Sequence, residues 1–157
     1  NPTQFGYTGQ VTDNRDGRVL HKSTGLVWMV CSHGQTWSPS ACGGTAGTFH
    51  WGIALWAAKS LNEAGGYAGR TDWRLPNIKE LSSIVERQCY GPAINSAIFP
   101  GTPKWSFPGG HHSSFWSASA SADSSDYVWG VSFDYGYAYS FSYKGSTLQV
   151  RLVRAGQ

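Results

Sequence analysis

The chain has 157 residues with a formal net charge of +3, and only 13% of its residues are charged whereas 15% are aromatic. This length suits a single domain over residues 1–157, and the low charge with abundant Trp, Tyr and Gly is typical of a loop-rich secreted fold, not of a helical bundle. The cations are spread without a dense basic run, and no apolar run is long enough to cross a bilayer, so we expect neither nucleic-acid binding nor a transmembrane segment in this chain.

Short strands are the first elements that the sequence predicts. Residues 10–13 and 18–22 flank Asn14-Arg15-Asp16-Gly17, which is typical of a hairpin turn. A second turn over residues 23–25 leads into residues 26–30, which predict a core strand.

Three cysteines follow at wide spacing. Cys31 and Cys42 bracket a turn-rich segment that a covalent link would stabilise, so we predict a Cys31–Cys42 disulfide and an oxidising compartment. Three reduced thiols in a cytosolic protein are the alternative, and Cys89 is expected to be buried. The cysteines lack the close spacing of a structural zinc site, and the adjacent His111 and His112 are interpreted as polar loop residues. We therefore predict no metal site and no cofactor.

Two helices are predicted before residue 90. The first covers residues 51–62 and ends at Gly65-Gly66. Its apolar face contains Trp51, Ala54, Leu55, Ala58 and Leu61.

The second helix begins at a specific joint. Pro76 disfavours helical geometry at Leu75, Asn77 can cap the helix, and Glu80 can complete a capping box. We expect this helix to end near Gln88. Its apolar face contains Ile78, Leu81, Ile84 and Val85.

After Cys89 the pattern becomes strand and loop. Strands are predicted at residues 115–119, 127–133, 137–143 and 148–154. The expected class is α+β, with two helices packed on a small antiparallel looped sheet.

A dense series of aromatic residues runs from Tyr127 to Tyr143. In strict alternation, Trp129, Val131 and Phe133 face inward, whereas Gly130, Ser132 and Asp134 face outward. One interpretation is an ordinary aromatic sheet core. The other is a binding surface, because Tyr gives large contact area at low entropic cost and Ser gives adaptable hydrogen bonds. The predicted ligand-binding residues are Tyr127, Ser132, Asp134, Tyr135, Tyr137 and Tyr139.

Several motifs spread over nearly the whole chain carry a resemblance to a known family. They include Thr24-Gly25-Leu26-Val27-Trp28-Met29, Asp72-Trp73-Arg74-Leu75-Pro76-Asn77, Pro92-Ala93-Ile94-Asn95, Phe115-Trp116-Ser117 and Val150-Arg151-Leu152-Val153-Arg154. Together they resemble the C-terminal domain family of the Legionella collagen-like adhesin, within the wider C-type lectin-like fold. The resemblance implies that fold, an extracellular or bacterial cell-surface location, and a protein or polysaccharide ligand. Trimerisation is possible by analogy with a collagen-like stalk.

The resemblance leaves two further functional alternatives. The family suggests sulfated glycosaminoglycans as ligands, and these could bind a cationic patch of Lys104, Lys144, Arg151 and Arg154. Against this, Arg74 and Arg151 could instead form ion pairs with Asp72 or Glu80. The Arg74-Leu75-Pro76 joint is also similar to a motif of formylglycine-generating enzymes, which rely on late cysteines.

We predict a non-enzymatic domain with no catalytic residues. No cysteine follows Cys89, Gly-x-Ser-x-Gly is missing, and the chain lacks the Glu-Pro-Asn or Gln-Pro-Asp calcium loop of sugar-binding C-type lectins. The residue types between Tyr127 and Ser142 resemble those in variable proteins of diversity-generating retroelements, with 150–154 as invariant scaffold. Because the chain begins at Asn1 without a signal peptide, we expect a mature or excised domain.

Overall fold

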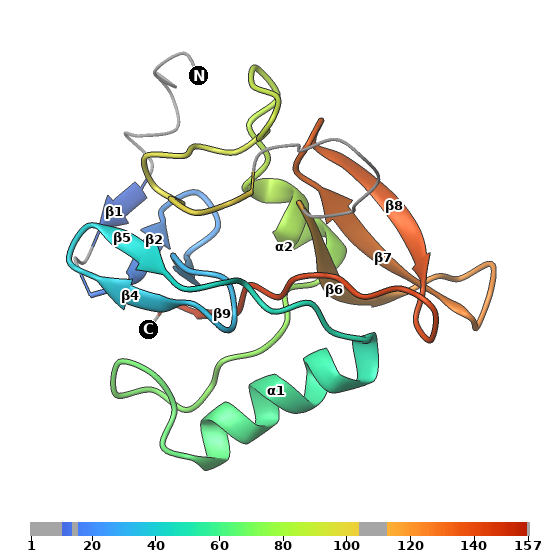
Figure 1. Cartoon of the computed structure of the whole chain (residues 1–157), viewed down its shortest axis with the longest axis horizontal. Helices are drawn as coiled ribbons and strands as arrows, with labels where there is room; N and C mark the ends of the chain where they lie inside the picture. Colours follow the sequence, from blue (N-terminus) through green and yellow to red (C-terminus); the bar gives the residue numbers. More distant parts are fainter. Residues whose placement is uncertain (1–10, 14–15, 104–112, 157) are drawn as a thin grey trace.

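A computed structural model provides the structure of the chain and describes residues 11–13, 16–103 and 113–156. The fold is of the α+β class, as predicted. Its elements, shown in Figure 1, are β1 (Val11–Asp13), β2 (Arg18–His21), β3 (Leu26–Met29), β4 (Thr36–Ser38), β5 (Ala41–Gly43), α1 (Trp51–Glu63), α2 (Ile78–Ser83), β6 (Ser114–Ala120), β7 (Tyr127–Ser132), β8 (Tyr137–Ser142) and β9 (Val153–Ala155).

The strands form three antiparallel sheets instead of the one sheet that we expected. The first has the order β1-β2-β3-β9, the second is the β4-β5 hairpin, and the third has the order β6-β7-β8. The predicted strand at 148–154 is largely wrong, because Leu148 and Gln149 make only isolated bridges, to Phe49 and Phe115, and β9 begins at Val153. The last strand nevertheless pairs with β3, so both ends of the described chain belong to one sheet (Figure 1).

Helix α1 has the predicted bounds to within one residue but buries a narrower face than expected. Its buried positions are the small residues Ala54, Ala57 and Ala58, which bring the helix close to the core. Leu55 was predicted to be buried but is 39% exposed, because the close alanine contact leaves the flanking side chains outside. The helix ends as predicted, with the N–H of Gly66 donating to the Leu61 carbonyl at 2.8 Å.

Helix α2 begins as predicted but ends five residues earlier than expected. Asn77 Oδ1 accepts from the Glu80 N–H at 2.8 Å, and Glu80 Oε1 accepts from the Asn77 N–H at 2.9 Å, which confirms the capping box. The helix stops at Ser83 because the following backbone takes other partners, and the Glu86 N–H donates to the Ala93 carbonyl at 2.8 Å. The apolar face is still used, since Leu81, Ile84 and Val85 are buried.

Two hydrophobic clusters lie on opposite sides of the third sheet. One cluster joins α2 to the first sheet and receives Phe115, Val131 and Phe133. The other lies under α1 and receives Trp116, Val128 and Phe141. Neighbouring residues of β6 therefore enter different clusters, and this alternation joins one face of the third sheet to the α2 cluster and the other face to the α1 cluster.

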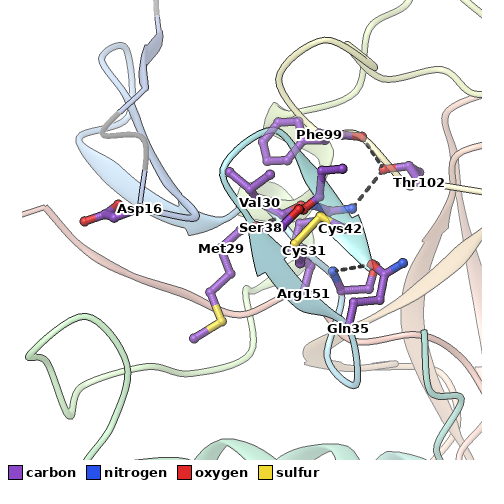
Figure 2. The surroundings of a disulfide bond; sticks show 12 residues. Asp16, Met29, Val30, Cys31, Gln35, Ser38, Cys42, Phe99, Thr102 and Arg151 are labelled. Atoms are coloured by element: carbon purple, nitrogen blue, oxygen red, sulfur yellow. Dashed lines mark hydrogen bonds between the residues drawn. A yellow bond between two sulfur atoms is a disulfide. The ribbon is translucent and has the colours of Figure 1, made fainter. Parts of the chain in front are cut away.

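The predicted Cys31–Cys42 disulfide is confirmed and links the end of β3 to β5 (Figure 2). Cys89 is buried, as expected, and lies outside this disulfide. The hairpin of β4 and β5, whose second strand contains Cys42, was not predicted. Its two strands have only three residues each and lie in a turn-rich sequence, so the pattern did not indicate them.

Candidate recognition surface

The predicted ligand-binding residues lie on β7, on β8 and in the turn between them, and we call them the recognition surface. The four tyrosines of this set are exposed, with fractions of 43% for Tyr127, 59% for Tyr135, 57% for Tyr137 and 47% for Tyr139. Ser132 and Asp134 are half-buried. The sheet-core interpretation therefore holds for Val131, Phe133 and Phe141, which are buried, but not for these tyrosines.

Strand register places the exposed rings of β8 on one face of the third sheet. Tyr137 pairs with Ser132, Tyr139 pairs with Gly130, and Phe141 pairs with Val128. Side chains of paired residues share a face, so this face changes from buried at the Val128 end to exposed at the Ser132 end. The cluster under α1 therefore covers β8 only at its Phe141 end.

Gly130 was expected to be exposed but is buried. A Cβ atom at this position would lie 2.7 Å from the Phe115 carbonyl oxygen and 3.1 Å from the Phe141 ring. The glycine thus lets the Phe141 ring lie directly on the sheet. Trp129, predicted to face inward, is half-buried.

The exposed rings rest on buried ones in a continuous series of edge-to-face contacts. Ring centroids are 6.0 Å apart for Trp116 and Phe141, 6.3 Å for Phe141 and Tyr139, and 6.5 Å for Tyr139 and Tyr137. Such contacts contribute about 0.5–1.5 kcal/mol each beyond burial. The tyrosines of β8 are therefore held by packing as well as by the strand.

The turn between β7 and β8 is anchored to the loop that follows α2. Gly136 has φ of +81°, its N–H donates to the Ser132 carbonyl at 2.9 Å, and a Cβ there would lie 2.5 Å from Val85 Cγ1. The Asp134 carbonyl accepts from the Gly91 N–H at 2.8 Å. This contact brings Tyr90, which is 77% exposed, next to the turn.

Tyr90 is a surface residue that the sequence did not single out. Its only signal was a tyrosine beside Gly91-Pro92 in a predicted loop, and nothing in the pattern indicated which part of the fold that loop contacts.

A concavity of about 560 Å³ opens within the recognition surface. Ser132 Oγ lies 3.5 Å from Asp134 Oδ2 and 3.4 Å from the Asp134 backbone nitrogen. Five of the six predicted residues line the concavity, and Tyr137 borders it through its contact with Tyr139. The lining comprises Ser114, Tyr127, Ser132, Asp134, Tyr135, Tyr139, Ser140, Phe141, Ser142 and Ser146.

The predicted cationic patch does not form from its two arginines. Arg151 is 1% exposed and Arg154 is 4% exposed, so the prediction that they reach a glycan is wrong. Lys104 lies outside the described residues. Lys144 is exposed, and its ammonium lies 5.3 Å from the centre of the Tyr143 ring.

Both arginines instead hold the core together. The Arg151 guanidinium lies between the Phe99 and Phe115 rings, 4.7 and 5.1 Å from their centres. It also donates to Thr102 Oγ1 at 2.9 Å and to the Val30 carbonyl (Figure 2). Such planar stacking with forked donation suits arginine and no other side chain.

The ion pairs near the α2 joint differ in part from the expected ones. Arg74 forms the predicted pair with Glu80, at 2.7 and 2.8 Å between its two terminal nitrogens and the carboxylate oxygens. The hydrogen bond from Arg74 lowers the pKa of Glu80. The partner of Asp72 is Arg154, not Arg151, at 2.8 Å, and this hydrogen bond lowers the pKa of Asp72.

A second exposed apolar area lies on α1, where Ile53, Leu55 and Trp56 face outward. Within residues 11–13, 16–103 and 113–156, no three His, Cys, Asp or Glu side chains gather closely enough to hold a metal ion. Neither of the helices in the described part of the chain is long and apolar enough to cross a membrane.

Comparison with known proteins gives one match. A model of the Lcl C-terminal domain matches residues 17–154, a span that includes both hydrophobic clusters, the disulfide and the recognition surface. No match was found among curated proteins or among solved structures.

Proposed function

The chain belongs to the family of Lcl C-terminal domains, and on that premise we propose that it is a non-enzymatic adhesion domain that recognises its ligand through the recognition surface. The observation that carries the proposal is the exposure of four tyrosines on β7, on β8 and in the turn between them. Exposed tyrosines at this density are costly for a surface without a partner, and Tyr is enriched among the residues that dominate binding energy at interfaces.

The packing of the surface also favours recognition. The Tyr137 ring contacts Tyr139, and the Tyr139 ring in turn contacts the buried Phe141, so few rotamers are lost when a ligand covers the two tyrosines. Stacking on the rings would supply most of the affinity, and hydrogen bonds from Ser132 and Asp134 would supply specificity.

We propose a C-type lectin-like fold and a location outside the cell or at the bacterial cell surface. Pairing of the last strand with β3 supports the fold, as does the separate third sheet, β6-β7-β8, which carries the recognition surface. The Cys31–Cys42 disulfide supports an oxidising compartment.

We also propose that the recognition surface is diversified by a retroelement. Residues 127, 135 and 137–140 are exposed, whereas the closing segment 150–154 is buried. Variation would therefore fall on the surface and spare the core. A reverse transcriptase gene and a template repeat beside this gene would support diversification, and their absence would count against it.

An adhesion assay tests the main proposal. Beads coated with the chain are applied to a panel of epithelial and immune cells and to a glycan array. Tyr135→Ala combined with Tyr137→Ala is expected to abolish adhesion, because the two most exposed rings of the recognition surface are lost. Trp56→Ala, which removes an exposed ring from α1, is the matched control and is expected to adhere normally. Normal adhesion of the double variant would refute the proposal.

Two alternatives have their own tests. Sulfated-glycan binding predicts retention on heparin-like polymers that weakens steeply with salt, but Lys144 is the only exposed member of the predicted patch among the described residues. A formylglycine-generating activity predicts copper-dependent oxidation of a cysteine peptide. We expect no product from that reaction.

A further inference from the structure

We propose that the concavity takes a lysine or arginine side chain from a protein partner. This inference rests on the proposed function and specifies the chemistry of the ligand at the same surface. Three features of the concavity support it: its charge, its unsatisfied hydrogen-bonding atoms and its aromatic walls.

The concavity is locally acidic on a chain whose net charge is +3. Among the described residues that line it, Asp134 is the only one with a charged side chain. A carboxylate in a concavity whose described lining contains no cation attracts ammonium and guanidinium groups and repels sulfate. The charge of the lining therefore opposes the sulfated ligands that the cationic patch was expected to bind.

Two polar atoms of the lining lack hydrogen-bond partners. Ser114 is 1% exposed, and its Oγ is shielded from solvent without a partner among the described residues. Asp134 Oδ1 is in the same state, and Asp134 Oδ2 has only the long contact of 3.5 Å with Ser132 Oγ. Leaving such atoms unsatisfied costs about 1–3 kcal/mol each. Because both atoms are shielded from solvent, a ligand N–H group would reach them only after the side chains that cover them move aside, and it would then recover part of this free energy.

The walls of the concavity suit a cation. Tyr127, Tyr135 and Tyr139 all line it and all have exposed rings. The face of a tyrosine ring attracts a cation that lies within about 6 Å of its centre. A neutral sugar could stack on the same rings, but it would leave the carboxylate charge uncompensated.

A long side chain from a folded partner also fits the surroundings. The concavity has about 560 Å³, which admits one lysine or arginine side chain with its solvent displaced. Tyr137 and Tyr90 are exposed beside it and would contact the backbone around that side chain. The arrangement resembles an interface with one central charged anchor and an aromatic rim.

Amide NMR of the isotopically labelled chain tests the inference with defined probes. N-acetyl-arginine methylamide and N-acetyl-lysine methylamide are titrated at low salt, and the uncharged isostere N-acetyl-citrulline methylamide and methyl glucoside are the comparisons. We expect saturable shifts at Ser114, Ser132, Asp134 and Tyr139 with both cations. Citrulline is expected to bind at least tenfold more weakly than arginine.

Variants connect the shifts to the concavity. Asp134→Asn is expected to weaken arginine binding at least tenfold, whereas Asp123→Asn, at an exposed acid outside the lining, is expected to leave it unchanged. The spectrum of each variant reports whether it folds. If Asp134→Asn does not fold, Tyr139→Ala provides an independent test, because the loss of an aromatic wall should also weaken arginine binding.

The outcomes separate this inference from the proposed function. Equal binding of arginine and citrulline would overturn the proposal of a cationic ligand, and so would saturation of the same amides by methyl glucoside alone. Either result would leave the proposed recognition surface intact. The absence of saturable shifts with every probe would also overturn the inference. The proposed function would still be judged by the adhesion of the tyrosine double variant.

Discussion

The Arg151 side chain shows how far a residue type alone determines a role. In the sequence, Arg151 and Arg154 were two cations near the end of the chain, available for a sulfated ligand. In the fold both are buried, Arg151 between Phe99 and Phe115 and Arg154 beside Asp72. The sequence could not indicate this because the rings that cover Arg151 come from loops and strands about 35 to 50 positions away along the chain.

Arg151→Lys is expected to lower the free energy of unfolding by about 3 kcal/mol, because an ammonium can neither stack between two rings nor reach Thr102 and Val30 together. Urea denaturation measures the change. Lys144→Arg, at an exposed cation, is the control and should stay within about 0.5 kcal/mol of the parent chain. A tolerated Arg151→Lys would mean that this guanidinium is not part of the core.

Glu80→Gln tests the electrostatics of the α2 joint. Glutamine keeps the capping-box bond to Asn77 but removes the charge that pairs with Arg74. Because the folded pKa of Glu80 is lowered, its contribution is complete above the unfolded pKa of about 4.3 and is lost as the pH falls through the folded pKa. The variant should be about 1 kcal/mol less stable than the parent at pH 7, with a smaller difference at pH 3. A difference that does not change with pH would contradict the pairing.

At the scale of elements, periodicity located the strands, but it did not indicate where along β8 the packing against the α1 cluster ends. Strands β6, β7 and β8 begin and end within one residue of the predicted bounds. Alternation also assigned Val131 and Phe133 to the interior correctly. It could not indicate that Phe141 is buried whereas Tyr139, on the same face, is exposed, because that difference depends on where the cluster under α1 stops.

Gly136→Ala tests whether the turn between β7 and β8 is fixed to the segment that follows α2. The added methyl would combine a strained positive φ with a contact of 2.5 Å to Val85, so we expect a loss of about 2 kcal/mol in the free energy of unfolding. Gly52→Ala, in the exposed part of α1 with no atom nearby, is the matched glycine control and should be neutral or stabilising by up to about 1 kcal/mol. Equal effects of the two changes would show that the turn is not anchored as described.

At the scale of the whole molecule, the residues that stabilise the fold, which we call the frame, are different from those that form the recognition surface. The frame consists of the two clusters, the capped α2 and the disulfide, and most of it could be predicted from local signals such as the Pro76 and Asn77 joint and the cysteine spacing. The division into three sheets and the contact of Tyr90 with the turn could not be predicted, since both depend on how distant loops pack. The surface consists of tyrosines that the frame holds but does not cover.

The measurement that tests this separation most directly is the thermal unfolding of the Tyr135→Ala, Tyr137→Ala double variant beside Phe133→Ala. Because both tyrosines are more than half exposed and, of the described ring contacts, only Tyr137–Tyr139 is lost, we predict a fall in Tm of less than about 5 °C for the double variant. Phe133 is fully buried, and its loss should lower Tm by roughly 10 °C. A double variant that unfolds as early as Phe133→Ala would show that the tyrosines belong to the frame, and the recognition surface would then have no basis.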